Sequence, residues 1–174
     1  AGDQTVFANA NNRNLTISGS ANKTMQGDVT VGGTATFNTG GCALEINGNT
    51  LYLNNSTTGT NGTITGSLTS NIVINGNATP AMVLPAINGG LNNFTINKTG
   101  ATNTVTLGGN LDVNGTLTLT AGALSIGANT LTIPDAANLI YGAGSLTGGV
   151  TSNLTIGTGA DITLNAIAGG LNNF

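Results

Sequence analysis

Apolar and polar residues alternate in short runs along most of the chain, and Gly or Asn separates one run from the next. In "LDVNGTLTL" (111–119) the residues Leu111, Val113, Leu117 and Leu119 are apolar, with polar residues between them. Successive side chains of a strand point to opposite sides, so this alternation predicts short strands that each bury one side.

A longer repeat relates the two halves of the chain at an offset between 79 and 82 residues. It divides the chain into a leading flank (1–13), a first copy (14–93) and a second copy (94–174), which we expect to form one continuous solenoid. The matching strings are "GDVTVGGTATF" (27–37) with "GNLDVNGTLTL" (109–119), "LEINGNTLYL" (44–53) with "LSIGANTLTI" (124–133), "TSNIVI" (69–74) with "TSNLTI" (151–156), and "GGLNNF" at 89–94 and again at 169–174.

A smaller period of about sixteen residues, each step holding two short strands, runs through the second copy. The first strands of its five steps are "FTINK" at 94, "LDVNG" at 111, "LSIGA" at 124, "LIYGA" at 139 and "LTIGT" at 154. A fixed period of strands separated by Gly and Asn turns predicts an all-β fold, a parallel β-helix or solenoid of about ten short turns built from the two tandem repeats. Parallel crossovers favour the right hand. A β-sandwich or meander would give similar alternation, but it would not require identities at every sixteenth residue.

Asparagine recurs immediately before the first strand of these steps. Asn tolerates turn conformations, and stacked Asn amides can hydrogen-bond from one turn to the next. We therefore predict a structural Asn ladder at one corner, in a column that also holds Asp28. Its asparagines are Asn14, Asn71, Asn93, Asn110, Asn138 and Asn153.

Composition narrows the possible partners. Charged residues make up 5% of the chain and aromatic residues 3%, while 28 Gly, 27 Asn and 30 Thr account for about half of it. Only three residues are Lys or Arg, which excludes a basic patch able to neutralise phosphates and so argues against nucleic acid. No stretch of eighteen apolar residues is present, and we expect no membrane span.

Candidate chemistry is sparse. With no His and one Cys, the sequence offers no metal cluster and no catalytic triad. Polysaccharide cleavage on a β-helix needs paired carboxylates, but the six acidic residues do not recur as columns when the two copies are overlaid. We therefore expect a protein that is not an enzyme and that holds no cofactor.

One outward array is a T-x-T ribbon in the second copy, which resembles the ice-facing surface of solenoid antifreeze proteins. The resemblance implies ice binding as an alternative function. Thr is also the natural polar residue for an exposed strand, since it is β-branched and neutral. The candidate residues are Thr104, Thr106, Thr116, Thr118, Thr130, Thr132, Thr147 and Thr163.

Several N-x-S/T sequons are present. Those most suited to glycosylation, if the source glycosylates, are the loop positions Asn54, Asn55 and Asn61.

The string "LDVNGTLTLTAGALSIGANTLTI" (111–133), with "GGLNNFTINKTGATNTVTLGGN" (89–110) before it, resembles the tandem repeats of very large secreted or surface-exposed adhesin-like proteins. Such repeats are common in Bacteroidetes that use type IX secretion, and autotransporter passengers are similar. The resemblance covers 14–174 and implies an extracellular stalk or filament, secreted or on the cell surface, with no catalytic residues. Its expected partners are cell-surface or glycan receptors and further copies of itself. Because no cap follows the last strand in the sequence, we expect head-to-tail stacking or further repeats.

Overall fold

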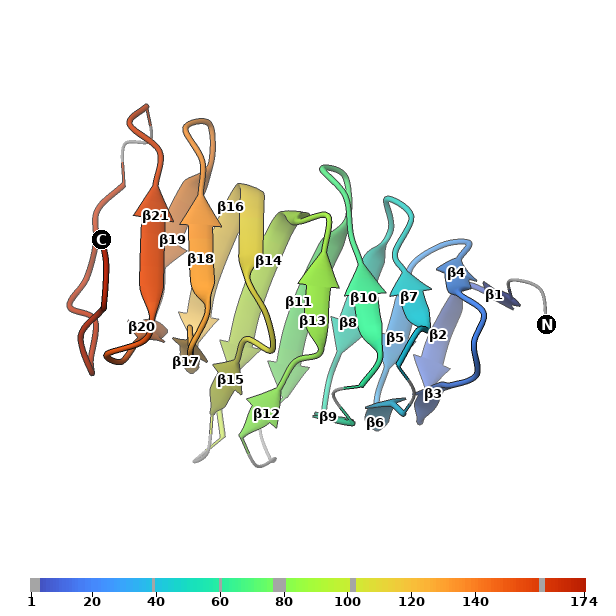
Figure 1. Cartoon of the computed structure of the whole chain (residues 1–174). Helices are drawn as coiled ribbons and strands as arrows, with labels where there is room; N and C mark the ends of the chain where they lie inside the picture. Colours follow the sequence, from blue (N-terminus) through green and yellow to red (C-terminus); the bar gives the residue numbers. More distant parts are fainter. Residues whose placement is uncertain (1–3, 39, 60, 77–80, 101–102, 160–161) are drawn as a thin grey trace.

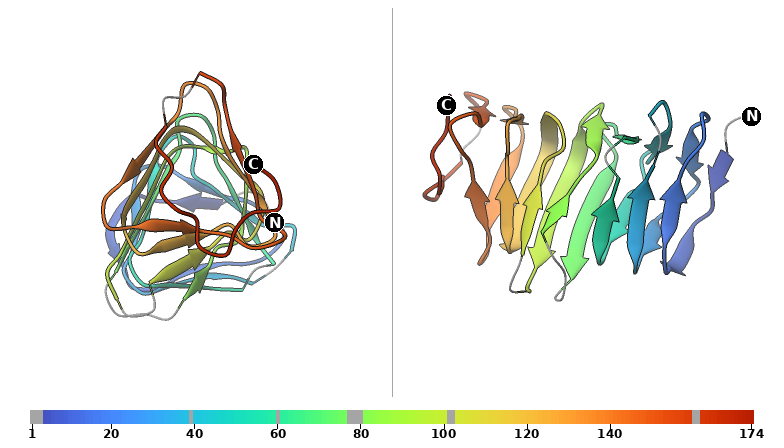
Figure 2. Two further views of the ribbon diagram at one scale, coloured as in Figure 1. Left: turned by 90° about the vertical axis from the view of Figure 1, so that its left-hand side faces the viewer. Right: turned by 60° about the horizontal axis from the view of Figure 1, so that its bottom comes forward.

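The computed structural model describes residues 4–38, 40–59, 61–76, 81–100, 103–159 and 162–174, in which the regular structure is all β. Every strand pair is parallel, and the strands stack along one axis (Figure 1). Seen along that axis, the chain winds around a triangular outline (Figure 2). The parallel β-solenoid expected from the sequence is confirmed, while its right-handed sense stays a prediction.

Each side of the triangle is a face built of parallel strands, here called face 1, face 2 or face 3, and the strands of face 3 form two separate hydrogen-bonded sheets. Face 1 holds β1 (Gln4–Val6), β4 (Lys23–Met25), β7 (Ala43–Glu45), β10 (Thr63–Thr65), β13 (Ala86–Asn88), the start of β16 (Leu111–Ala121), β18 (Thr130–Ile133) and β21 (Asn153–Ile156). Face 2 holds β2 (Asn9–Asn12), β5 (Val29–Val31), β8 (Thr50–Leu53), β11 (Asn71–Gly76), β14 (Leu91–Lys98), the end of β16 and β19 (Asn138–Tyr141). Face 3 holds β3 (Leu15–Ile17), β6 (Thr34–Phe37), β9 (Ser56–Thr58), β12 (Met82–Val83), β15 (Thr104–Thr106), β17 (Ala123–Ser125) and β20 (Ser145–Thr147).

One turn of the solenoid takes about 22 residues and three strands. Asn71 pairs with Thr50 on one side and with Asn93 on the other, and Thr116 pairs with Asn138. Six successive turns run from β4 to β20, with β1–β3 before them and β21 after them. The prediction of ten turns of sixteen residues was therefore wrong, because a step of two strands is only two thirds of a turn.

The leading flank is part of the same stack. β1 pairs with β4 and β2 pairs with β5, so the solenoid begins before residue 14.

The core is a single apolar column along the axis. Inward residues are mainly Leu, Ile and Val, and they form one contiguous cluster from Ile17 to Leu154. At its middle, Phe94 is 0% exposed and lies in register between Ile72 and Leu117. A thin core of this kind is continuous only because each turn covers the apolar side of the turn before it.

The repeated strings of the sequence lie on different faces. The string of β7 on face 1 matches that of β17 on face 3, and the string of β11 on face 2 matches that of β21 on face 1. Counting the two halves of β16 as separate strands, β21 comes eleven strands after β11. Eleven strands make three turns of three strands plus two further strands. A residue of the second copy therefore lies on a face next to the one that holds its counterpart in the first copy.

Lys98 is buried at the end of β14, with 1% of its surface exposed. Burial lowers the pKa of its ammonium group below the ordinary value of 10.5. Because the folded protein then binds fewer protons than the unfolded chain, stability should rise with pH between the lowered pKa and 10.5. We expect the free energy of unfolding of the unsubstituted protein to rise relative to that of Lys98→Met between pH 7 and pH 10, because only the former loses a proton from this site. Denaturant titrations of both proteins at several pH values measure this difference, and a constant difference would contradict it.

Candidate functional site

The residues of the expected T-x-T ribbon do not form one surface. Thr104, Thr106 and Thr147 lie on face 3, in β15 and β20. Thr116 and Thr118 lie on face 2, in the second half of β16, and both are half-buried. Thr130 and Thr132 lie on face 1, in β18, while Thr163 is exposed outside the strands. The ribbon was built on a sixteen-residue period, and the true period separates its members.

Face 3 instead carries an array of its own, along the lower side of the rod in Figure 1. Its outward residues form two columns that follow the strand register, and we call them the face 3 array. Thr57 Oγ1 donates to Val83 O at 2.6 Å, and this hydrogen bond connects the sheet of β3, β6 and β9 to the sheet of β12, β15, β17 and β20. The array consists of Thr34, Thr36, Ser56, Thr58, Ala81, Val83, Thr104, Thr106, Ala123, Ser125, Ser145 and Thr147.

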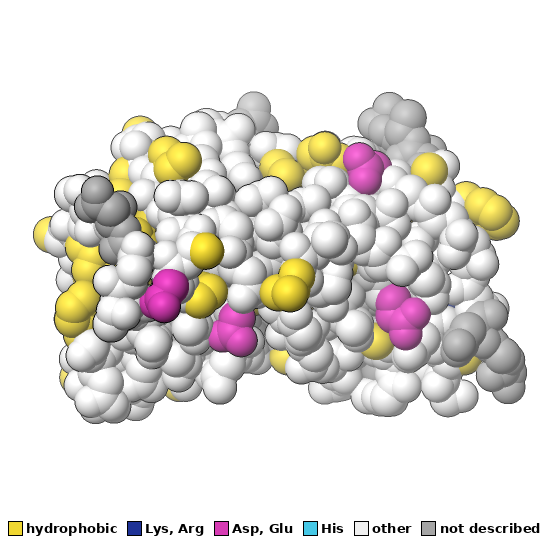
Figure 3. Space-filling model, turned by 90° about the horizontal axis from the view of Figure 1, so that it is seen from above, with side chains coloured by type: hydrophobic (Ala, Val, Ile, Leu, Met, Phe, Trp, Pro, Cys, Tyr) yellow, Lys and Arg dark blue, Asp and Glu magenta, His cyan; other side chains and the backbone are white. Residues whose placement is uncertain are grey.

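The other two faces are less uniform. Face 1 presents the carboxylates of Glu45 and Asp112, and face 2 presents Tyr52, Val73 and Ile140 in one column with Thr118. Figure 3 looks onto the side of the rod turned away from face 3, where acidic and apolar side chains are scattered among neutral polar ones. By contrast, the described strands of face 3 present no charged side chain to solvent.

The six asparagines of the expected ladder do not lie in one column. They are divided among three columns of stacked residues, one on each face. On face 2, Asn93 Nδ2 donates to Asn71 Oδ1 at 3.0 Å, and Asn138 follows in the same column after Thr116. On face 3, Asn14 Oδ1 accepts from the backbone N–H of Thr34 at 2.8 Å. On face 1, Asn110 Oδ1 accepts from the N–H of Thr130 at 2.9 Å, and Asn153 Oδ1 accepts from Asn173 Nδ2 at 3.1 Å.

A second run of asparagines, which sequence reasoning missed, stacks at the other edge of face 2. Asn75 Nδ2 donates to Asn54 Oδ1 at 3.2 Å, and Asn97 Nδ2 donates to Asn75 Oδ1 at 3.3 Å. The signal in the sequence is an Asn after the second inward residue of three successive face 2 strands, which only a period near 22 reveals. Of the expected glycosylation positions, Asn61 is exposed, whereas Asn54 and Asn55 are half-buried.

Asn93 links three successive turns and provides a test of the ladder. Its Oδ1 accepts from the N–H of Thr116 at 3.0 Å, and its Nδ2 contacts Asn71. Asn93 is half-buried, and removing its side chain leaves the N–H of Thr116 without this acceptor, so we expect Asn93→Ala to lower the free energy of unfolding by about 1 kcal/mol. Asn138→Ala, at the exposed end of the same column, should change it by less than about 0.5 kcal/mol. Equal effects in denaturant titrations would contradict a specific role for Asn93.

Three of the described acidic residues, Asp28, Glu45 and Asp135, accept hydrogen bonds from a neighbouring turn, and Asp135 Oδ1 accepts from the N–H of Gly159 at 3.3 Å. Glu45 accepts from Asn22 Nδ2 at 2.7 Å and from Thr24 Oγ1 at 2.6 Å. Asp28 Oδ1 accepts from the N–H of Thr50 at 2.7 Å, as the corner asparagines do. These carboxylates therefore hold neighbouring turns together.

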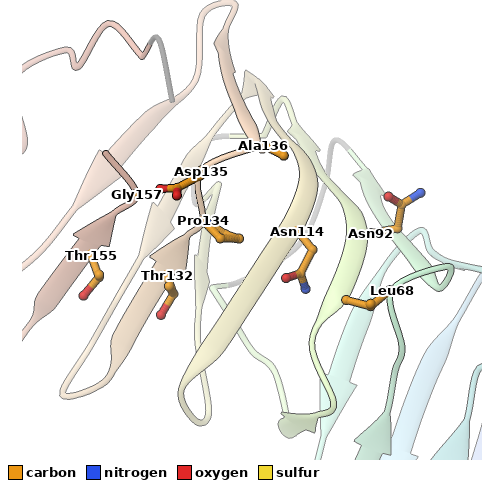
Figure 4. A pocket seen from close by; sticks show the side chains of 9 residues that line it. All are labelled: Leu68, Asn92, Asn114, Thr132, Pro134, Asp135, Ala136, Thr155 and Gly157. Atoms are coloured by element: carbon orange, nitrogen blue, oxygen red, sulfur yellow. The ribbon is translucent and has the colours of Figure 1, made fainter. Parts of the chain in front are cut away.

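A groove of about 650 Å³ lies at the corner between faces 1 and 2 (Figure 4). At this corner only residues 89–90 separate β13 from β14, and β16 continues from face 1 to face 2 without a break, while Leu68 and the segment 134–136 project on either side. Asn92 and Asn114 lie between these walls (Figure 4). Among the described residues that line the groove, Asp135 is the only acidic one, so these residues include no carboxylate pair of the kind used in acid–base chemistry.

Comparison of the chain with protein-family models, with curated proteins and with solved structures gave no match. Within the described ranges, no helix is long and apolar enough to cross a membrane. The described residues also include no group of three or more His, Cys, Asp or Glu side chains placed to hold a metal ion.

Proposed function

We propose that this chain is a non-enzymatic, extracellular structural repeat protein that serves as the stalk or filament-forming part of a cell-surface adhesin. In this role the rod bears mechanical load and holds the binding site of the adhesin at a fixed distance from the cell surface. That site binds a receptor on another cell or a surface glycan. The two copies act as joined links of one rod.

The observation that supports this proposal is the continuity of the stack through the junction of the two copies. Strand β14 contains the end of the first copy and the start of the second, and it pairs with β11 on one side and with β16 on the other. Phe94, at the junction itself, is completely buried. A chain built this way can be lengthened by adding copies, because each turn offers a complete set of backbone partners to the next.

Assembly of separate rods would use the same principle. An open edge strand presents unpaired N–H and C=O groups, and a heterologous contact that joins one end to the other end of the next molecule produces a filament. We propose this head-to-tail mode, or stacking of further repeats of the same chain, as the way in which longer stalks form.

The function is tested by two measurements, the location of the protein on source cells and its assembly into filaments. Antibodies raised against the purified rod should label the surface of intact source cells in immunogold electron microscopy. Concentrated protein should form unbranched filaments of single-rod width, and its sedimentation coefficient should increase with concentration. Labelling confined to the cell interior would exclude an adhesin stalk. A monomer at all concentrations would exclude head-to-tail assembly and leave covalent repetition as the way to lengthen the rod.

A further inference from the structure

Lys23 and Cys42 meet in the interior of the rod, near its N-terminal end. Lys23 lies in β4 and is 8% exposed, and Cys42 stands just before β7 and is 1% exposed. These two strands are neighbours on face 1 (Figure 1). The Lys23 Nζ atom lies 3.8 Å from Cys42 Sγ and donates a hydrogen bond to the sulfur. An amine and a thiol, both nucleophiles, are therefore in contact across the boundary between two turns.

One backbone oxygen holds the two groups together. Ala21 O accepts hydrogen bonds from Lys23 Nζ and, at 3.0 Å, from Cys42 Sγ. Ser18 O lies 3.7 Å from the same sulfur and accepts from it as a second carbonyl. Both carbonyls belong to the chain segment between β3 and β4, so the nitrogen and the sulfur share one fixed anchor. Groups held in contact in this way react far more readily than the same groups free in solution.

Packing alone does not explain a lysine at this position. Lys23 points inward and pairs in register with Leu44, and Ile64 and Ile87 continue the same buried column. An ammonium group loses its hydration when it is buried, which costs free energy unless a countercharge replaces the water. Its hydrogen bonds go instead to a neutral carbonyl and to a thiol. A leucine or isoleucine would fit this column without that cost.

The internal repeat shows that the fold does not require this pair. The offset that relates β7 to β17 assigns Asn103 as the counterpart of Lys23, and Gly122 as the counterpart of Cys42. The solenoid continues through both copies, with Asn103 just before β15 and Gly122 just before β17. Lysine and cysteine therefore occur together in one copy and are both replaced in the other. This joint replacement indicates a role that needs the two residues at once.

We propose that Lys23 and Cys42 form a covalent N–O–S crosslink on exposure to dioxygen. The reactants are the neutral amine, the thiol and one molecule of dioxygen. One N–H bond, the S–H bond and the O–O bond break. New N–O and S–O bonds form to one oxygen atom, and the other oxygen leaves as water with the two released hydrogens. Nitrogen and sulfur lose two electrons each, and dioxygen gains these four. Because an oxygen atom spans part of the 3.8 Å gap, this bridge requires less movement of the side chains than a direct S–N bond.

The surroundings of the pair suit this reaction. Dioxygen is small and apolar, so it can dissolve in the apolar core that contains Met25 and Leu44. Larger thiol reductants cannot reach a sulfur that is 1% exposed. Cys42 is the only cysteine of the chain, so no second thiol of the same molecule competes for it.

The crosslink would tie β4 to β7 and restrict the unfolded chain, as a disulfide does. In the proposed stalk it would keep these two turns from separating under load. That consequence, unlike the bond itself, rests on the proposed function.

The test uses purified protein that is kept in dioxygen-saturated buffer and then unfolded for mass spectrometry. The crosslinked chain should have gained one oxygen atom and lost two hydrogen atoms. Trypsin cleaves after unmodified lysine, so it should fail to cut the crosslinked chain after Lys23 while still cutting after Lys98. Dithiothreitol added to the unfolded chain should restore both the original mass and the cleavage after Lys23. The folded, crosslinked protein should also melt several degrees higher than protein prepared without dioxygen.

Matched variants identify the atoms that react. Cys42→Ser and Lys23→Met should each abolish the mass change, whereas Lys98→Met, which replaces the other buried lysine, should retain it. Circular dichroism of each variant establishes that it is folded. The unsubstituted protein decides the question even where a variant misfolds, since its mass and its tryptic cleavage are compared before and after reduction.

Three results would overturn the proposal. The first is an unchanged mass of the unsubstituted protein after exposure to dioxygen. The second is a gain of oxygen with normal cleavage after Lys23, because that pattern shows oxidation of sulfur alone. The third is a mass change that persists in Cys42→Ser.

Discussion

Phe94→Ala is expected to lower the free energy of unfolding by about 3–5 kcal/mol, the range for truncating a buried Phe. Phe94 is 0% exposed and stands between Ile72 of the preceding turn and Leu117 of the next. Phe94 packs in a core filled by the inward residues of all three faces, and its truncation should leave a cavity among them. Denaturant titration followed by circular dichroism measures the change.

The hexapeptide that contains Phe94 supplies its own control. Phe174 ends the second "GGLNNF" and is 79% exposed. Phe174→Ala should therefore alter stability by less than about 0.5 kcal/mol. Solenoids can unfold in parts, so the two variants should be compared by midpoint and by slope. Similar losses in both would show that Phe174 is buried in solution by another molecule or by further chain.

Gly108→Ala is expected to destabilise the rod by about 2–4 kcal/mol, from overpacking together with lost backbone hydrogen bonds. A Cβ at Gly108 would lie 1.9 Å from the carbonyl oxygen of Leu84 in the turn below. The two turns would have to separate there, although Leu84 N donates to Thr106 O at 2.9 Å close by. Only glycine allows neighbouring turns to approach this closely at that corner.

The matched control for this prediction is Gly149→Ala. A Cβ at Gly149 has Ser152 Oγ as its nearest neighbour, at 4.0 Å. This variant should therefore melt within a few degrees of the unsubstituted protein, while Gly108→Ala should melt clearly lower. Equal melting temperatures would mean that the turns are able to separate at Gly108 without cost.

Much of the fold could be predicted from local chemistry. Alternation of apolar and polar residues marks the strands correctly, and Leu111, Val113, Leu117 and Leu119 are all buried as expected. Asparagine before a strand also indicates a corner, because its amide can satisfy a backbone N–H of the next turn, as Asn14 and Asn110 do.

The number of strands in a turn could not be read in the same way. Strands on all three faces share the same apolar, polar, apolar pattern, so the pattern does not say which strand lies beside which. Some strands also lack the alternating pattern: β9 has the sequence "STT", without an apolar residue, and β12 has only two residues. Only the hydrogen-bonded register, such as Asn71 with Asn93, fixes a period near 22. The predicted T-x-T ribbon combined residues of three faces for this reason, and the face 3 array could not be recognised without the register.

Because one copy spans eleven strands, each copy is rotated by one face about the rod axis relative to the copy before it. In a chain with more copies, three of them would contain 33 strands, or eleven whole turns, before a repeat position faced the original direction again. Insertion or loss of a single copy would rotate everything beyond it by a third of a revolution. A receptor site repeated in every copy would therefore be offered on three sides of the stalk. Conversely, a continuous strip along one side can persist only if the copies diverge at their surfaces, as Glu45 and Ser125 have done.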